Sequence, residues 1–212
     1  MRSFVIILSL LLFFNSLAAQ PYFEGELIYR SEIFKKVGGK TLPDSTQPVS
    51  YIKESFKGGN WIQKPDQSIV EYMYFDTLTN KIYWKVRNTD TLFFEDGRYR
   101  RAAEKYPTLK YYIVLNSDTL LGMVCNSLII QTKGLKLTLV YCPTLQINPA
   151  WYSKTKIGFY DLIYNKTKSI YLKSIVETRQ SISTTTATEI YYTNVEDSVF
   201  PDVHHVILKK LF

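Results

Sequence analysis

Most of this chain alternates apolar and polar residues with a period of two, and this pattern limits the folds it can adopt. Clear examples are residues 24–34, 68–76, 81–87 and 168–177, which are separated by short links rich in Gly, Asn, Asp and Thr. A period of two puts successive side chains on opposite faces of a strand. About a dozen such segments with hairpin-length links predict a mainly β protein whose curved antiparallel sheet curls or closes.

Three segments receive more specific predictions. Residues 35–48, with two adjacent glycines and two prolines, are expected to form a long exposed loop. Residues 97–107, ended by a proline, are the best candidate for one of the one or two short helices. The run IGFYDLIY, residues 157–164, is expected to be a strand.

The N-terminus has the pattern of a secretory signal peptide. Arg2 is followed by an apolar run from Phe4 to Phe14 and by small residues up to Ala19. Cleavage after Ala18 and cleavage after Ala19 both remain open. The alternative is an uncleaved membrane anchor, but the apolar run is shorter than the ~20 residues that span a bilayer. Since no cysteine lies near the cut, a lipidated N-terminus is not expected.

The predicted organisation is a signal peptide over residues 1–19 and a single β-rich domain over 20–212. We expect an exported product, periplasmic or extracellular, with no transmembrane segment after cleavage. Hydrophobic residues make up 46% of the chain, enough for a sizeable core. The net charge of +7 could attract an anionic lipid or reflect a solvated surface alone. Because the basic residues never form a run of five, no nucleic-acid partner is expected.

Two hairpins can be read in register. A loop at 77–80 pairs Asp76 with Lys81, which puts four apolar residues on one face in the pairs Phe75–Ile82 and Met73–Trp84. The other face, expected to be wetted, carries Tyr72, Tyr74, Tyr83 and Lys85. A loop centred on Lys133-Gly134 gives a second apolar face with the pairs Leu128–Leu139 and Ile130–Leu137.

The second hairpin also pairs the only two cysteines of the chain, Cys125 and Cys142, on the face opposite Leu128. Non-hydrogen-bonded partners have Cα atoms about 4.5 Å apart, which is within reach of a disulfide. An exported protein meets oxidising conditions. We therefore expect a Cys125–Cys142 disulfide, and two free buried thiols are the alternative.

Residues that could carry catalysis are scarce. The only histidines, His204 and His205, are adjacent and would point to opposite faces of a strand, so they do not easily share a metal. Phosphate-binding, nucleophile-elbow and zinc motifs do not occur in the sequence. Carboxylates such as Glu54, Glu71 and Asp161 lie on alternating segments and are interpreted as a solvated face, although a glycosidase pair stays open. We expect no enzyme, no cofactor and no metal.

Several stretches together resemble the LolA/LolB-like lipoprotein-carrier superfamily, including its secreted relatives of the GLPGLI type. These stretches are FEGELIYR, FKGGNWIQ, EYMYFDTLTNKIYW, DTLLGMVCNSLII, INPAWYSKTKIGFYDLIY and NVEDSVFPDV. The resemblance implies a half-barrel whose concave face is partly covered by short helices or loops. In the carriers that face is an apolar groove for acyl chains, so no catalytic residue is implied.

The resulting prediction is an exported protein that binds a lipid or other apolar ligand without catalysis. Its lining would be the apolar faces of the two hairpins, Met73, Phe75, Ile82, Trp84, Leu128, Ile130, Leu137 and Leu139. The same residues could instead form a filled core. The protein would then be an envelope structural or interaction protein that binds an envelope partner through its outer Tyr/Lys-rich face. An envelope hydrolase is a third reading.

Overall fold

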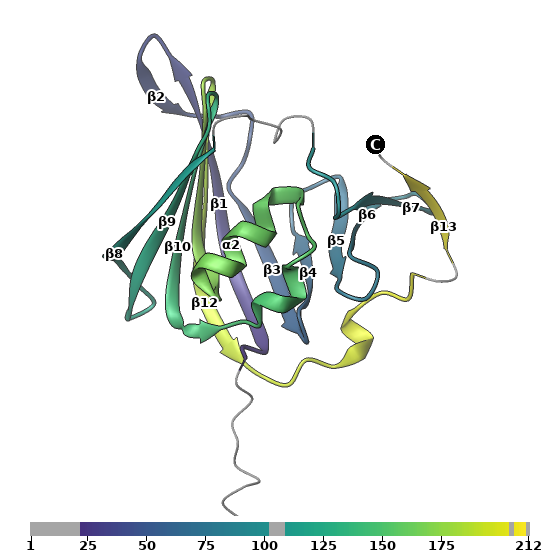
Figure 1. The fold of residues 1–212 in the computed structure, drawn as a ribbon. Helices are drawn as coiled ribbons and strands as arrows, with labels where there is room; N and C mark the ends of the chain where they lie inside the picture. Colours follow the sequence, from purple (N-terminus) through teal and green to yellow (C-terminus); the bar gives the residue numbers. More distant parts are fainter. Residues whose placement is uncertain (1–21, 102–108, 204–205, 211–212) are drawn as a thin grey trace, which may run out of the picture.

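The computed structural model describes residues 22–101, 109–203 and 206–210. Within these ranges the strands form one 13-stranded sheet, with the order β13-β7-β6-β5-β4-β3-β1-β12-β11-β10-β9-β8 and with β2 paired to β1 (Figure 1). The strands are β1 (Gly25–Val37), β2 (Lys40–Pro43), β3 (Ser50–Lys57), β4 (Asn60–Pro65), β5 (Val70–Asp76), β6 (Lys81–Val86), β7 (Thr91–Asp96), β8 (Lys110–Leu120), β9 (Met123–Gln131), β10 (Leu135–Gln146), β11 (Ser169–Thr178), β12 (Ser181–Tyr192) and β13 (Ile207–Lys210).

The predicted fold class is confirmed, since the protein is mainly β and its sheet is largely antiparallel. The exception is β13, which pairs with β7 in parallel. The prediction of a long loop over residues 35–48 is wrong for the first half of that segment. There β1 continues to Val37 and turns through Gly38 and Gly39, both with positive φ, into β2. Glycine reaches this conformation at no steric cost, so the two glycines make a hairpin where a loop was expected.

The strand expected at residues 157–164 is also wrong, because the chain between β10 and β11 is helical. This stretch, the helical insert, consists of η2 (Pro149–Tyr152), η3 (Ile157–Phe159) and α2 (Tyr160–Thr167). The Asn148 side chain accepts a hydrogen bond from the Ala150 amide at 3.0 Å and caps its start. In α2 the buried residues Ile163, Tyr164 and Thr167 recur at helical spacing. A short apolar run fits a strand and a helix equally well, so the sequence pattern alone does not distinguish the two here.

The other predicted helix, over residues 97–107, does not begin where expected. Gly97 donates its amide hydrogen to the Asn80 carbonyl at 2.8 Å, and residues 97–101 form a turn and an extended link. The remainder of that prediction lies outside the described residues.

The sheet bends around the helical insert. On one side Tyr152 stacks on Phe75 of β5 and Tyr160 meets Trp61 of β4 edge-on, with ring centroids 5.3 and 6.1 Å apart. On the other side α2 contacts β9 and β11. In a flat sheet β5 and β9 would lie roughly 34 Å apart, at ~4.8 Å per strand, far more than the ~10 Å width of one helix. The sheet therefore curls, and in Figure 1 strands lie on both sides of α2.

The inner face of the sheet, defined as the face that packs on the helical insert, holds the main core. Leu27, Phe75, Leu128 and Ile130 are fully buried there together with Tyr152 of the insert. Aromatic rings fill much of this space because they bury large apolar areas with few degrees of freedom. The inner face is therefore packed by the chain's own side chains.

A second cluster covers the outer face of β4 to β7. It contains Ile62, Tyr74, Tyr83, Leu92 and Val203, with Val199 and Phe200 packed against it. The expectation that Tyr74 and Tyr83 face water is wrong, because residues 197–203 cross over this face before the chain pairs with β7. We call residues 197–203 the C-terminal strap. Phe200 lies 5.8 Å from the Tyr74 ring, and Figure 1 shows the strap rising beside β5 to β7.

Both predicted hairpin registers are confirmed. Phe75 pairs with Ile82 and Met73 with Trp84 between β5 and β6. The second hairpin shows the pairs Leu128–Leu139 and Ile130–Leu137. In each case the turn length and the apolar face point to one register, and a slip by one residue would reverse the faces.

The predicted Cys125–Cys142 disulfide is wrong, because both cysteines are free and buried in the structure. The ladder between β9 and β10 ends at the Asn126–Tyr141 pair, and the register of β10 against β11 shifts next to Tyr141. The Cys125 thiol donates to the Met123 carbonyl at 3.3 Å, and the Cys142 Sγ lies 2.9 Å from the Thr144 hydroxyl. Burial raises the pKa of Cys125, and its contact with the Cys142 side chain adds to this rise, so the two thiols lie close together without a bond between them.

The outer cluster generates a stability prediction. Val203→Ala removes apolar volume from a site that is only 6% exposed, so we expect it to lower the free energy of unfolding by about 1–2 kcal/mol. The matched control is Val206→Ala at a site that is 40% exposed, which should change it by less than about 0.5 kcal/mol. Urea denaturation of both variants gives the comparison. Equal effects would mean that the strap does not hold the outer cluster.

The free thiols generate a second prediction. Intact mass after alkylation of unfolded, unreduced protein should show two adducts, whereas the folded protein should react slowly because both thiols are buried. Adducts that form only after a reductant is added would show that the cysteines are bridged.

Candidate functional site

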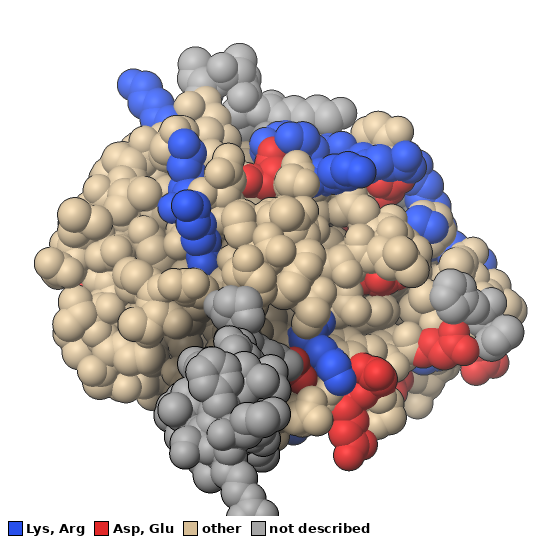
Figure 2. Space-filling view, turned by 60° about the horizontal axis from the view of Figure 1, so that its bottom comes forward, with Lys and Arg blue, Asp and Glu red and all other residues tan. Residues whose placement is uncertain are grey.

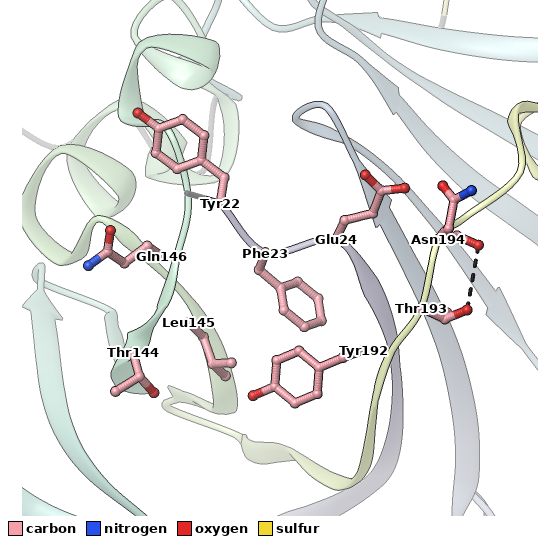
Figure 3. Close-up of a pocket in the computed structure, with 9 residues that line it drawn as sticks. All are labelled: Tyr22, Phe23, Glu24, Thr144, Leu145, Gln146, Tyr192, Thr193 and Asn194. Carbon is pink, nitrogen blue, oxygen red and sulfur yellow. Dashed lines mark hydrogen bonds between the residues drawn. The ribbon is translucent and has the colours of Figure 1, made fainter. Parts of the chain in front are cut away.

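A pocket of about 400 Å³ opens at the base of the sheet, where β1 begins and β10 and β12 end. Figure 3 shows its lining, which is Tyr22, Phe23, Glu24, Thr144, Leu145, Gln146, Tyr192, Thr193 and Asn194. One lining residue, Glu24, carries a charge. The others are aromatic, aliphatic or neutral polar side chains. This composition suits an apolar or uncharged ligand better than an ion.

The floor of the pocket belongs to the inner core. Phe23 and Leu145 are both buried members of that core, and the Phe23 ring meets Phe56 of β3 edge-on at 5.9 Å. On the open side the Tyr192 ring is 68% exposed, although it lies 5.7 Å from Phe23. One ring, that of Phe23, thus separates the pocket from the interior.

Backbone contacts hold the rim of the pocket in place. The Phe23 amide donates to the Gln146 carbonyl at 2.7 Å, which ties the start of β1 to the end of β10. Gly25 has a φ of 154°, and a Cβ at this position would collide with the Tyr191 carbonyl oxygen, so β1 and β12 meet here only with glycine. Glu24 accepts a hydrogen bond from the Val195 amide at 3.0 Å. The Glu24 carboxylate therefore helps to hold the rim of the pocket together.

The charges on the molecule are unevenly distributed. In Figure 2, which brings the base forward, Lys and Arg side chains gather along one edge and Asp and Glu lie mainly on one side. A broad area of the same view carries few charges. The face shown is thus divided between charged and largely uncharged surface.

Two rows of side chains lead inward from the pocket across the inner face. The row nearer the pocket runs across β1, β3, β4, β5 and β6. It consists of Gly25, Phe56, Trp61, Phe75 and Ile82. The next row is Leu27, Glu54, Gln63, Met73 and Trp84. Residues two apart on a strand are about 7 Å apart. Glu54 is therefore one row deeper than the ring of Phe56, which touches the pocket floor.

Glu54 is a carboxyl group inside an aromatic interior. It is 3% exposed, and its Oε2 atom has no hydrogen-bond partner. Burial raises the pKa of Glu54 from its ordinary 4.5 to about 8, and a hydrogen bond with Gln63 opposes this rise. The group is thus a neutral acid at pH 7. The phenol rings of four tyrosines lie near enough to interact with its charge, the buried Tyr29, Tyr152 and Tyr164 and the partly buried Tyr171.

Two further buried nitrogen atoms have no partner among the described residues, Trp84 Nε1 and Arg100 Nη1. Trp84 is in the same cross-strand row as Glu54. Arg100 lies 4.8 Å from the ring of Phe159 in the helical insert, and its other terminal nitrogen is 3.4 Å from Asp161 Oδ1. Buried polar groups normally have hydrogen-bond partners, so each exception indicates a possible contact with a molecule that binds there.

The structure brings all eight predicted lining residues into the inner core. Five are buried, Phe75, Ile82, Leu128, Ile130 and Leu139, and three are partly buried against them, Met73, Trp84 and Leu137. They share one curved face with the helical insert packed on it. That they contact a ligand stays a prediction.

The sequence reading missed Glu54, which it assigned to a solvated face. A signal was present, because in SYIKESF the acid lies between Ile52 and Phe56 on the same face of the strand.

The residues that the structure describes were also searched for metal sites and for membrane-spanning helices. No group of three or more His, Cys, Asp and Glu side chains could hold a metal. No described helix is long and apolar enough to cross a membrane. The two histidines lie outside these residues.

Comparisons with known proteins give distant structural similarity. No protein-family model and no curated protein matches the sequence. The structure of PNGF-II is similar with a TM-score of 0.44 and 11% identity over 87% of this chain, which spans 31% of that protein. A LolA superfamily protein from Nitrosomonas europaea has a TM-score of 0.42 and 10% identity, covering 86% of this chain and 91% of that one.

An outer-membrane lipoprotein-sorting protein domain from Vibrio parahaemolyticus has a TM-score of 0.27 and 8% identity, with 82% and 88% of the two chains covered. The resemblance expected from the sequence is thus matched by structural similarity to LolA superfamily and lipoprotein-sorting domains. This similarity concerns the course of the chain and does not identify a ligand.

The buried acid generates a pH prediction. Between pH 4.5 and about 8 Glu54 keeps its proton when folded and loses it when unfolded. The stability that this proton contributes is complete below pH 4.5 and is lost as the pH rises toward 8, by on the order of 1 kcal/mol per pH unit. Glu54→Gln should remove this part of the pH dependence and raise the melting temperature at pH 8.

The control for this prediction is Glu71→Gln, at an exposed position on β5. It should follow the wild-type pH profile. Thermal unfolding from pH 5 to 9 gives the three curves. Parallel profiles for wild type and Glu54→Gln would show that Glu54 is ionised in the folded protein.

Proposed function

We propose that the chain is an exported, non-catalytic protein that binds a lipid-like apolar ligand. The apolar part of the ligand lies between the inner face of the sheet and the helical insert. Its other end reaches the surface at the basal pocket. The observation that carries the proposal is the pocket floor, where the core residues Phe23 and Leu145 meet an opening edged by the exposed ring of Tyr192.

The size and lining of the pocket support this proposal. Ligand pockets usually measure about 300–1,000 Å³ and are mostly apolar with a few polar groups. The basal pocket, at about 400 Å³, lies within that range and has neutral polar side chains at its rim. An exposed aromatic ring beside a buried apolar floor suits a molecule that is apolar at one end and wetted at the other.

Occupation of the interior requires side chains to move, because protein cores are close-packed. The helical insert is the element best suited to yield. It forms no ladder with the sheet and packs on it mainly through side chains, with backbone hydrogen bonds such as that from the Lys156 amide to the Gly97 carbonyl at 2.6 Å. Moving it would cost packing contacts while leaving the strand pairing intact.

The signal-peptide pattern of residues 1–19 supports export, so we propose that this activity lies in the periplasm or the extracellular space. The partner we propose there is a lipid or an acyl chain. The predicted lining residues of the two hairpins would form the walls of the ligand site, deeper than Phe23.

A second candidate function rests on the edge strand β8. Five consecutive apolar residues of this strand, Tyr111 to Leu115, are exposed although they are large. An exposed edge strand can add a strand from a partner. An envelope interaction protein would use this edge, since the strap covers the outer face of β4 to β7.

The test is the binding of an acyl-chain probe, cis-parinaric acid, to the mature protein. Tyr192→Ser removes the ring at the pocket rim and should weaken binding about fivefold, corresponding to ~1 kcal/mol. The matched control is Tyr191→Ser on the same strand, 48% exposed and outside the pocket lining. It should bind like the wild type.

Native mass spectrometry of protein purified from the periplasm adds a direct measurement, in which a co-purified lipid is expected. If the wild type neither binds the probe nor carries a lipid, the ligand proposal is wrong. A protein captured through β8 under those conditions, and lost on Ile113→Lys, would favour the interaction function.

A further inference from the structure

We propose that Glu54 recognises an uncharged hydrogen-bond acceptor within the ligand, the carbonyl oxygen of an ester or amide, so that the preferred ligands are acyl esters or acyl amides rather than plain hydrocarbons. This inference rests on the proposed function and names the class of ligand. The observation behind it is a buried carboxyl whose Oε2 has no partner, one row inside the floor of the pocket.

The position of Glu54 suits a ligand that comes through the basal pocket. The ring of Phe56, two residues further along β3, touches Phe23 of the pocket floor. Two residues of a strand correspond to about 7 Å. A ligand that displaces Phe23 therefore meets Glu54 as the first polar side chain of β3 on the inner face.

The surrounding hydrogen bonds leave one atom of Glu54 available. Gln63 bonds to the carboxyl group. The Tyr29 hydroxyl donates to the Tyr171 carbonyl at 2.8 Å, and the Tyr152 hydroxyl donates to the Gly59 carbonyl at 2.6 Å. These phenol donors are therefore already used. A protonated carboxyl has one O–H donor, and the ligand must supply its acceptor.

Trp84 supports the same chemistry. Its Nε1 atom is buried without a partner and lies in the same row of the inner face, three strands away, about 14 Å in a flat sheet. An indole N–H can only donate. Both unpartnered groups in this row are thus hydrogen-bond donors. The carbonyl oxygen of an acyl ester or amide is an acceptor within an otherwise apolar molecule.

Charge selects against ionic ligand groups at this depth. The side chains that interact with Glu54 are Gln63 from β4, Tyr29 from β1, Tyr171 from β11, and Tyr152 and Tyr164 from the helical insert. Burial raises the pKa of Glu54 to about 8, so the carboxyl is neutral at pH 7. An anionic group beside Glu54 would find no cationic side chain among those that face this carboxyl, and an unpaired buried charge costs several kcal/mol.

The test compares two competitors of equal heavy-atom count, methyl dodecanoate and pentadecane, for displacement of cis-parinaric acid from the mature protein. Relative to Glu54→Leu, the wild type should favour the ester over pentadecane about tenfold more, the effect of roughly one hydrogen bond. Glu54→Gln keeps an N–H donor and should keep the wild-type ratio of the two affinities. Glu54→Leu removes the donor and should shift that ratio toward pentadecane, the more hydrophobic competitor. Unfolding curves of both variants confirm that they are folded.

Each remaining outcome has one meaning. If the wild type binds neither the probe nor the competitors, the proposed function itself fails. If the ratio of the ester affinity to the pentadecane affinity is the same in the wild type and in Glu54→Leu, this inference is overturned while the proposed function stands. Tighter binding of dodecylammonium than of the ester, lost in Glu54→Leu, would overturn it in favour of a cation site.

Discussion

The packing of Tyr152 between Phe75 of the sheet, on which it stacks, and Tyr164 of α2, which it meets at a tilt, is the contact on which the rest of the structure depends. The ring centroids are 5.3 and 4.0 Å apart on the two sides. Because Tyr152 lies near the start of the helical insert and Tyr164 in its last helix, this one ring fixes both ends of the insert against β5. The sheet has to bend to cover the other side of α2. The buried position of Glu54, beneath the insert, follows from that bend.

The sheet divides into two parts with different surroundings. Strands β4 to β6 are covered on both faces, by the helical insert inside and the C-terminal strap outside. Strand β8 at the opposite edge is exposed along most of its length. The first part is held by packing on both of its faces, whereas the edge at β8 is not. A ligand site between them would have one fixed wall and one that adapts, which is how a carrier can accept chains that differ in length.

Strand pairing was predictable from the sequence where a short turn and an alternating apolar face agree, as in Phe75–Ile82 and Leu128–Leu139. The predictions failed where tertiary contacts decide. The helical insert is apolar enough to be read as a strand, and Tyr74 and Tyr83 are buried by the strap, which comes from far along the chain. The disulfide is absent although the two thiols lie close enough to interact. Of the candidate site, the apolar faces were predictable, whereas Glu54 was missed because charged residues are rarely buried.

The parallel pairing of β13 with β7 has a consequence for how the protein folds. Val203 completes a cluster that otherwise comes from residues 62–92, so the outer core needs contacts between segments far apart in the chain. Such non-local contacts form slowly, since the entropy of closing a long loop is lost before they stabilise anything. Until the last residues are available, Ile62, Tyr74 and Tyr83 form an exposed apolar surface beside the open edge of β7. The outer core is therefore complete only when the last described residues have packed on it, and the surface that would favour aggregation is covered in that final step.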